Sequence, residues 1–137
     1  MKSFLLDSSA LIALVISDHE HHQRVSEWFQ NTQSRFALCP ITEGALGRYL
    51  LRTGESAAGV AHLLTLLHDH PRIEFWPDSI SYLDVPLMGL RGHRQLTDAY
   101  LVALAASRKA RLATLDIPLA ATWPKQALLI PDSSTAQ

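Results

Sequence analysis

The stretch FLLDSSALIALVI, residues 4–16, decides how the fold of this chain begins. Its first three apolar residues are too few for a helix and predict a buried strand, which ends at Asp7. Two serines follow, and because serine caps helices well, the apolar run from Ala10 to Ile16 predicts a helix. A carboxylate therefore stands at the carboxyl end of the first strand, the edge at which open α/β sheets bind ligands.

Length and composition are those of a globular domain without a membrane partner. The 137 residues suffice for a hydrophobic core, and an apolar fraction of 47% argues against disorder. No apolar run approaches the roughly 18 residues of a membrane helix, and Asp7 interrupts the apolar segment that a signal peptide needs. The sole cysteine, Cys39, cannot form an internal disulfide, so we expect a cytoplasmic protein.

Short apolar runs alternate with helical patterns along the rest of the chain. We expect strands at residues 3–6, 35–39, 73–76, 112–115 and 127–130, and helices at residues 9–16, 21–31, 42–52, 55–68, 79–90 and 98–108. This alternation predicts βαβ units, and hence a three-layer α/β/α domain with a mostly parallel sheet of four or five strands. We expect the domain to span residues 1–131 and a flexible tail to follow at residues 132–137.

Four acidic residues occupy equivalent places at strand ends and helix starts: Asp7, Glu43, Asp98 and Asp116. Because these places lie at one edge of a parallel sheet, the four carboxylates can converge. Two carboxylates about 4 Å apart repel by roughly 4 kcal/mol at an effective dielectric constant of about 20, so such a cluster calls for a cation. Oxygen ligands favour Mg²⁺ or Mn²⁺ over zinc. Taken singly, Glu43 and Asp98 also fit a capping role, and Asp116 fits a turn.

These residues carry a resemblance to a known family. The segments LLDSSALIAL at residues 5–14, LTDAYLVALA at residues 96–105 and ATLD at residues 113–116, with Glu43 between the first two, closely resemble a PIN domain. More narrowly, the chain resembles the VapC toxins of bacterial toxin–antitoxin systems over residues 1–131. The resemblance implies a Mg²⁺-dependent endoribonuclease that a small cognate antitoxin protein holds silent.

The resemblance also implies roles for particular residues. Asp7, Glu43, Asp98 and Asp116 match the acidic positions of the family and are the expected metal-binding and catalytic set. Thr114 matches a hydroxyl position beside the site, and Ser8, or alternatively Ser9, is expected to serve in the same way.

Basic residues precede or follow two of the four acids. Arg91, His93 and Arg94 form a loop before the third acid, where they can meet the phosphates of an arriving RNA. Arg48 and Arg52 lie one helical turn apart on the helix that carries the second acid, and we expect them to contact RNA as well. Ordinary surface solvation is the alternative for all five, since the net charge of the chain is −1.

Two alternatives to a nuclease stay open. A phosphotransfer protein would use Asp7 as its nucleophile, but Ser9 stands where such a phosphatase has its second acid. A non-catalytic binding module would keep the fold, hold a basic partner with its acids and gain no stability from Mg²⁺. We also expect a homodimer, because the family resemblance implies one and because Trp28 and Phe29 form an apolar helix face that a small sheet need not cover fully. The alternative is that these two side chains belong to the core.

Overall fold

A computed structural model describes residues 2–132 of the chain. Five strands form a sheet in which every neighbouring pair is parallel, in the order β3-β2-β1-β4-β5. The strands are β1 (Ser3–Leu6), β2 (Arg35–Leu38), β3 (Ile73–Phe75), β4 (Arg111–Thr114) and β5 (Ala127–Leu129). The helices are α1 (Ser8–Val15), α2 (His22–Asn31), α3 (Pro40–Arg52), α4 (Ala57–Asp69), α5 (Gln95–Ser107) and α6 (Ile117–Thr122). The tail predicted at residues 132–137 lies outside the described residues except for its first position.

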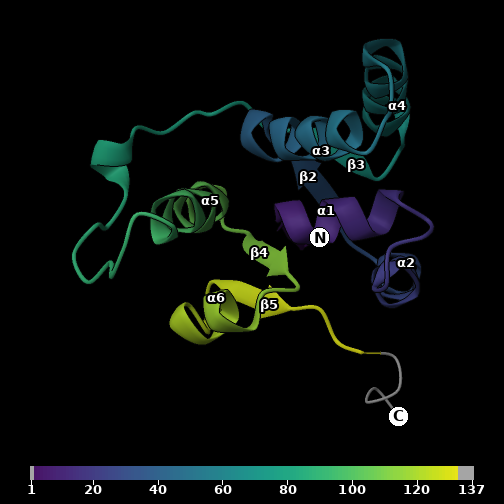
Figure 1. Ribbon diagram of the computed structural model, residues 1–137. Coiled ribbons are helices and arrows are strands. Elements are labelled where there is room, and N and C mark those ends of the chain that lie inside the picture. Colours follow the sequence, from purple (N-terminus) through teal and green to yellow (C-terminus); the bar gives the residue numbers. More distant parts are fainter. Residues whose placement is uncertain (1, 133–137) are drawn as a thin grey trace.

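The sheet separates two hydrophobic layers, because successive residues of a strand point to opposite faces. Phe4 and Leu6 pack with residues of α1 and α2, whereas Leu5 between them packs with residues of α5 and α6. In Figure 1 the strands form a diagonal layer, with α5 on one side and α1 and α2 on the other. The predicted three-layer α/β/α arrangement is confirmed, and the sheet is parallel throughout.

Trp28 and Phe29 belong to the first of these layers and do not form an uncovered face. Trp28 is 9% exposed and meets the rings of Phe4 and Phe36 edge-on, at centroid separations of 5.3 and 5.2 Å. Phe29 lies 4.5 Å from the Phe36 ring, and the guanidinium of Arg72 covers its face at 4.6 Å. The argument for a homodimer from these two side chains is therefore wrong, and the homodimer itself stays a prediction.

Residues 79–90, predicted as a helix, instead form an extended connection with one short 3₁₀ turn, η1 (Tyr82–Asp84). Pro86 lacks the N–H that a continuing helix needs. Leu83 and Met88 are 95% and 96% exposed, so the segment buries no continuous apolar face. Burial of such a face is what stabilises most short helices, and its absence over these residues explains the wrong prediction.

The helices beside the acidic residues begin earlier than predicted. The first helix, α1, begins at Ser8 and has Asp7 as its N-cap, while α3 begins at Pro40. Helix α5 begins at Gln95, so Asp98 lies inside its first turn. The short helix α6 follows Asp116, where the sequence indicated only a turn.

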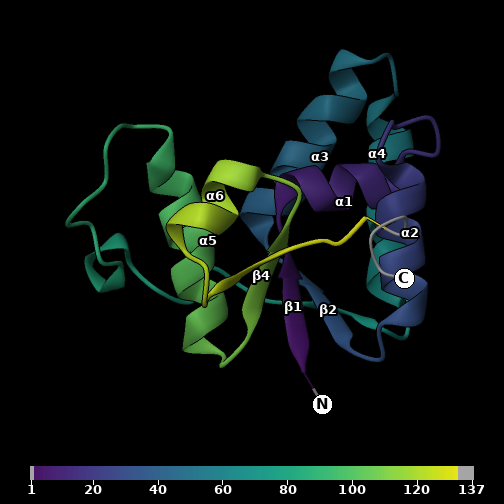
Figure 2. The ribbon, with the colours of Figure 1, turned by 90° about the horizontal axis from the view of Figure 1, so that it is seen from below.

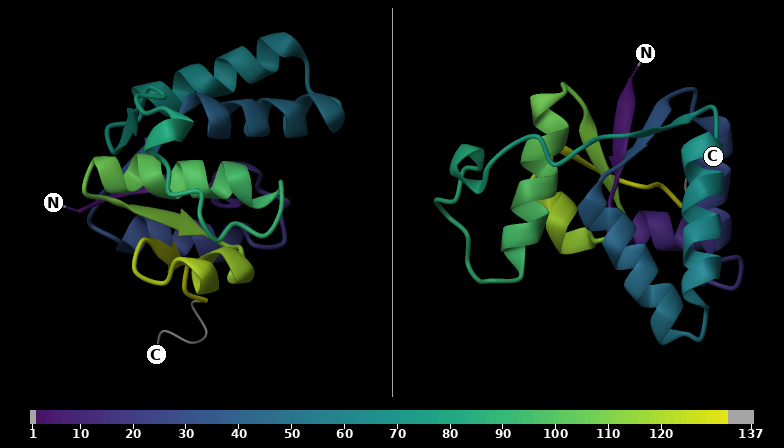
Figure 3. Two further views of the ribbon diagram at one scale, coloured as in Figure 1. Left: turned by 90° about the vertical axis from the view of Figure 1, so that its left-hand side faces the viewer. Right: turned by 90° about the horizontal axis from the view of Figure 1, so that it is seen from above.

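One edge of the sheet collects the starts of α1, α3 and α5. Helices that connect parallel strands run back across the sheet, so they begin at the carboxyl ends of the strands. Figure 2 shows β1 running from the N-terminus towards α1, with α3 lying beyond the same end. Figure 3 shows α3 and α4 side by side, and contacts between them join the two helices into a hairpin.

Within residues 2–132, the helices are all too short or too polar to cross a membrane.

Candidate active site

Asp7 is a buried carboxylate at the end of β1, and hydrogen-bond donors surround it. Its Oδ1 accepts the backbone N–H of Ser8 at 2.8 Å, and its Oδ2 accepts the hydroxyls of Thr114 at 2.7 Å and Ser9 at 3.4 Å. Burial raises the pKa of Asp7, and the hydrogen bond from Thr114 opposes this effect by stabilising the charged form. The charge of Asp116 raises the pKa further. These bonds fix the orientation of an acid that the fold has taken out of water.

Asp98 lies in the first turn of α5 and is partly buried. Its pKa is raised to about 6, first by burial and then by the negative charges of Asp7 and Asp116. Three aspartates from three separate elements therefore share one electrostatic field. A carboxyl group with this pKa is mostly ionised at neutral pH, so the cluster concentrates negative charge of the kind that attracts a cation.

Asp116 is exposed where β4 ends, and it also has a capping role. Its Oδ1 accepts the N–H of Leu119 at 3.0 Å and so caps α6. Its own N–H donates to Oγ1 of Thr114 at 3.0 Å. The Thr114 hydroxyl thus bridges the Asp7 carboxylate and the Asp116 backbone, which holds the ends of β1 and β4 in register at the cluster.

Glu43 stands in the first turn of α3, and its carboxylate is bonded across to the next helix. Its Oε2 lies 2.5 Å from Nε2 of His68 on α4. Because a carboxylate only accepts hydrogen bonds, Nε2 carries the proton in this contact. Leu64 and Thr65 complete the lining of an open pocket of about 340 Å³ around the pair. Glu43 is therefore bound to α4, while the charges that raise the pKa of Asp98 are those of the other two aspartates.

The four acids fit a divalent metal by donor chemistry but do not meet at one point. Among residues 2–132, no three His, Cys, Asp or Glu side chains lie close enough to hold one ion. Asp7, Glu43 and Asp116 each accept hydrogen bonds from the protein donors just described. The donor set is oxygen only and strongly negative, which suits Mg²⁺ or Mn²⁺. Convergence of the four acids on one ion stays a prediction.

The predicted basic loop is exposed directly before α5. Arg91, His93 and Arg94 all present exposed side chains. The backbone N–H of Arg91 donates to Oε1 of Gln95 at 2.8 Å, which ties the loop to the first turn of the helix. Arg91 and Gln95 also line an open, mainly polar pocket of about 360 Å³ that reaches Thr122 of α6.

Arg48 and Arg52 are exposed on α3, the helix that carries Glu43. The guanidinium of Arg48 folds back over Gly44, where its Nη1 lies 3.7 Å from the position that a Cβ atom would take. Arg52 lies over the ring of Tyr49 at 5.7 Å from its centroid. Both cations therefore lie along the outer surface of α3, apart from the loop that precedes α5.

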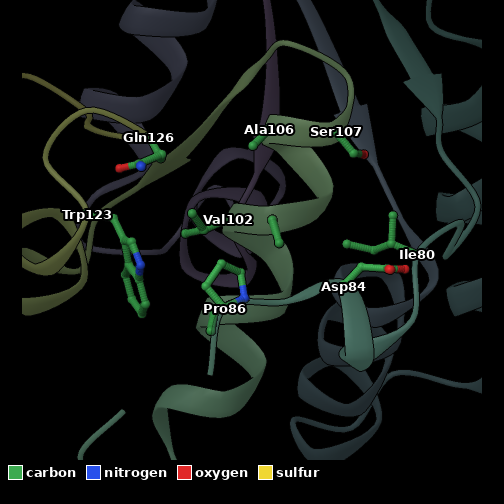
Figure 4. Close-up of a pocket in the computed structure, with 10 residues that line it drawn as sticks. Ile80, Asp84, Pro86, Val102, Ala106, Ser107, Trp123 and Gln126 are labelled. Atoms are coloured by element: carbon green, nitrogen blue, oxygen red, sulfur yellow. The ribbon is translucent and has the colours of Figure 1, made fainter. Parts of the chain in front are cut away.

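A separate pocket of about 390 Å³ lies beside α5 and has a different character. Figure 4 shows Val102 of α5 between Trp123 on one side and Ile80 and Asp84 on the other. Its lining is mostly apolar, and none of the four candidate acids belongs to it. It lacks the concentrated charge that a metal or phosphate site requires.

Sequence reasoning did not assign His68 to the site. It is 25 positions away from Glu43, and no spacing rule connects a residue of α4 with one of α3. Of the two serines predicted as alternatives, Ser8 contacts Asp7 through its backbone N–H. The hydroxyl contact comes from Ser9, which also accepts the N–H of Leu115 at 3.3 Å.

Comparisons with known proteins agree on one family. A family model described as the PIN domain matches residues 4–122. The chain is 45% identical over 130 residues to ribonuclease VapC29 of Mycobacterium tuberculosis, which covers 95% of this chain and 98% of that protein. It is 38% identical over 118 residues to ribonuclease VapC38 of the same organism, a match that covers 82% of this chain and 84% of that protein. The crystal structure of M. tuberculosis VapC20, a toxin that cleaves the sarcin–ricin loop, matches with a TM-score of 0.65 at 14% identity, covering 87% of this chain and 94% of that one.

Proposed function

We propose, because this chain belongs to the PIN-domain family and is a VapC ribonuclease toxin of a toxin–antitoxin system, that it cleaves RNA endonucleolytically with Mg²⁺ held by its acidic residues. The observation that carries the proposal is the field shared by Asp7, Asp98 and Asp116. Carboxylates gathered from separate elements cost stability unless a cation neutralises them, so this arrangement favours a functional origin over a structural one.

Each acid has a proposed part in the site. Asp7 and Asp98 bind the metal directly, and Glu43 and Asp116 complete its ligands directly or through water. When bound, Mg²⁺, or Mn²⁺ in its place, polarises a water molecule and the scissile phosphate. The hydrogen bond from Thr114 favours the ionised form of Asp7 against the effect of burial, and the N–H of Ser8 fixes the other oxygen of that group.

The exposed cations are proposed to bind the substrate. Arg91, His93 and Arg94 would contact RNA phosphates on one side of the acids, and Arg48 and Arg52 on the other. A cation is a poor ligand for Mg²⁺, so guanidinium groups next to an acidic site act on the anionic substrate. Their exposure supports this assignment, since each is accessible to a strand that crosses the site.

The partners follow from the family. As a VapC toxin the chain has a small antitoxin as its cognate partner, and we propose that the antitoxin blocks RNA cleavage. In this proposal, RNA cleavage in the cytoplasm inhibits translation and thereby stops growth. The homodimer is a further proposal, and the described apolar side chains most open to a second copy are those of Leu83 and Met88.

The test is cleavage of RNA by the purified chain. Labelled RNA is incubated with Mg²⁺, with Mn²⁺ or with a chelator, and Asp98→Asn serves as the inactive variant. We expect cleavage with either metal, none with the chelator and none by the variant. Sequencing of RNA 5′ ends after brief expression in cells then identifies the substrate. A chain that binds a partner but never cleaves RNA would instead be the binding module, and a phosphorylated Asp7 would favour phosphotransfer.

A further inference from the structure

The bond between Glu43 and His68 sets one proposed metal ligand apart from the other three. We propose that His68 is a positioning residue whose hydrogen bond turns the Glu43 carboxylate towards α4 and competes with a metal ion for it. In this view Glu43 leaves the imidazole when Mg²⁺ binds, so the contact with His68 opposes metal binding. The inference rests on the function proposed above, because it assumes that the acids bind a metal.

The His68 ring is held in place for this contact. It stacks on the ring of Phe75 at the end of β3, with centroids 5.3 Å apart and planes inclined by 29°. Its Nε2 donates a hydrogen bond to Oε2 of Glu43, and hydrogen bonds to an ionised acceptor are stronger than those between neutral groups. The Glu43 side chain is only 17% exposed, so water competes weakly for its oxygen. The fold thus presents a fixed donor to one carboxylate.

The surroundings of Glu43 show that this bond turns its carboxylate towards α4. The pocket around the pair is lined by Leu64 and Thr65 of α4, so the carboxylate faces the hairpin of α3 and α4. Within residues 2–132, no three potential ligands are close enough to share an ion. Oxygen ligands of Mg²⁺ lie at about 2.0–2.1 Å from the ion in near-octahedral geometry, so the Glu43 side chain must move before it can bind directly.

Competition between His68 and the metal for Glu43 predicts the direction in which the Kd of the metal changes when His68 is replaced. A contact that stabilises the metal-free state and is lost in the metal-bound state weakens metal binding by its own free energy. His68 is 42% exposed, so we place the contact in the upper range of surface pairs, which corresponds to roughly a fivefold change in Kd. Removing the donor should therefore tighten metal binding by about that factor.

Two substitutions separate the donor from the ring. His68→Phe keeps an aromatic ring on Phe75 and removes the hydrogen-bond donor. His68→Gln keeps a donor of similar reach and removes the ring. His62→Phe is the matched control, because His62 is an exposed histidine on the same helix. The Kd of Mn²⁺ and of Mg²⁺ for each purified full-length variant is measured by titration calorimetry without RNA, with Asp98→Asn included.

We expect His68→Phe to bind either metal about fivefold more tightly, with His68→Gln and His62→Phe within about twofold of the wild type. In addition, Mg²⁺ should shift the imidazole NMR signals of His68 and leave those of His62 in place. Unchanged or weaker metal binding by His68→Phe, while Asp98→Asn abolishes binding, would overturn this inference and leave the proposed function intact. A wild type that binds neither metal would overturn both.

Discussion

Asp98→Asn tests whether the ionised Asp98 side chain lowers the free energy of unfolding of the protein. Asparagine has nearly the same shape as aspartate and carries no charge at any pH. The pKa of Asp98 rises from 3.8 to about 6 in the folded protein. A shift of about two units corresponds to roughly 3 kcal/mol of destabilisation by the ionised group. Asp98 is partly exposed and solvent screens its charge, so we reduce this to about 1–2 kcal/mol.

The expected gain in stability depends on pH in a defined direction. Between the unfolded pKa of 3.8 and the folded pKa of about 6, the native state holds more protons than the unfolded state. The wild type is therefore stabilised as the pH falls through this window, whereas the asparagine variant has no such group to titrate. The variant should be more stable than the wild type above pH 6, and the difference should vanish below about pH 4.

Thermal unfolding in the presence of a chelator measures this difference. For a chain of this size each kcal/mol changes the melting temperature by roughly 3–5 °C, so Asp98→Asn should melt about 3–10 °C higher at neutral pH. Asp18→Asn, at an exposed aspartate between α1 and α2, is the control and should melt like the wild type. The same Asp98 variant should have lost RNA cleavage. A variant that melts at or below the wild type at neutral pH, or a gain that persists in acid, would refute the electrostatic argument.

Four further outcomes follow from the same structure. Mn²⁺ or Mg²⁺ at a hundredfold excess over Kd should stabilise the wild type by about 2.7 kcal/mol in unfolding experiments, and a melting temperature indifferent to both ions would contradict this. In an Asp98→Asn background, changing Arg91 and Arg94 to Ala should make the negative slope of log K against log salt shallower by about 1.4 in RNA filter binding. An unchanged slope would mean that the RNA does not contact this loop. Thr114→Val should cost about 1–3 kcal/mol in denaturant unfolding, because the buried Asp7 loses its 2.7 Å hydrogen bond. Gly44→Ala should raise the free energy of unfolding by about 0.5–1 kcal/mol, because a Cβ atom there makes only an ordinary contact at 3.7 Å. A lower free energy of unfolding would mean that Arg48 cannot adjust to the new methyl group.

Local pattern was sufficient wherever a segment had one clear way to bury its apolar residues. The run at residues 4–16 predicted β1, α1 and a carboxylate between them, and all three are present. The helix predicted at residues 79–90 is absent, and its apolar residues Leu83 and Met88 are exposed although such side chains are usually buried. Hydrophobic content shows that a residue can be buried, but only the packing of other elements determines whether it is.

Local patterns in the sequence were enough to indicate the family, the alternation of strands and helices, and the position of each acid at a strand end or a helix start. These features depend on local periodicity and on chain direction, which the sequence contains directly. The side-chain partners of two acids depend on tertiary packing, which brings Thr114 to Asp7 and His68 to Glu43. Such pairs join residues 107 and 25 positions apart, and their geometry depends on how whole elements pack. Burial and then the neighbouring charges in the folded chain raise the pKa of Asp98, and a contact between two helices orients Glu43; spacing along the chain reveals neither.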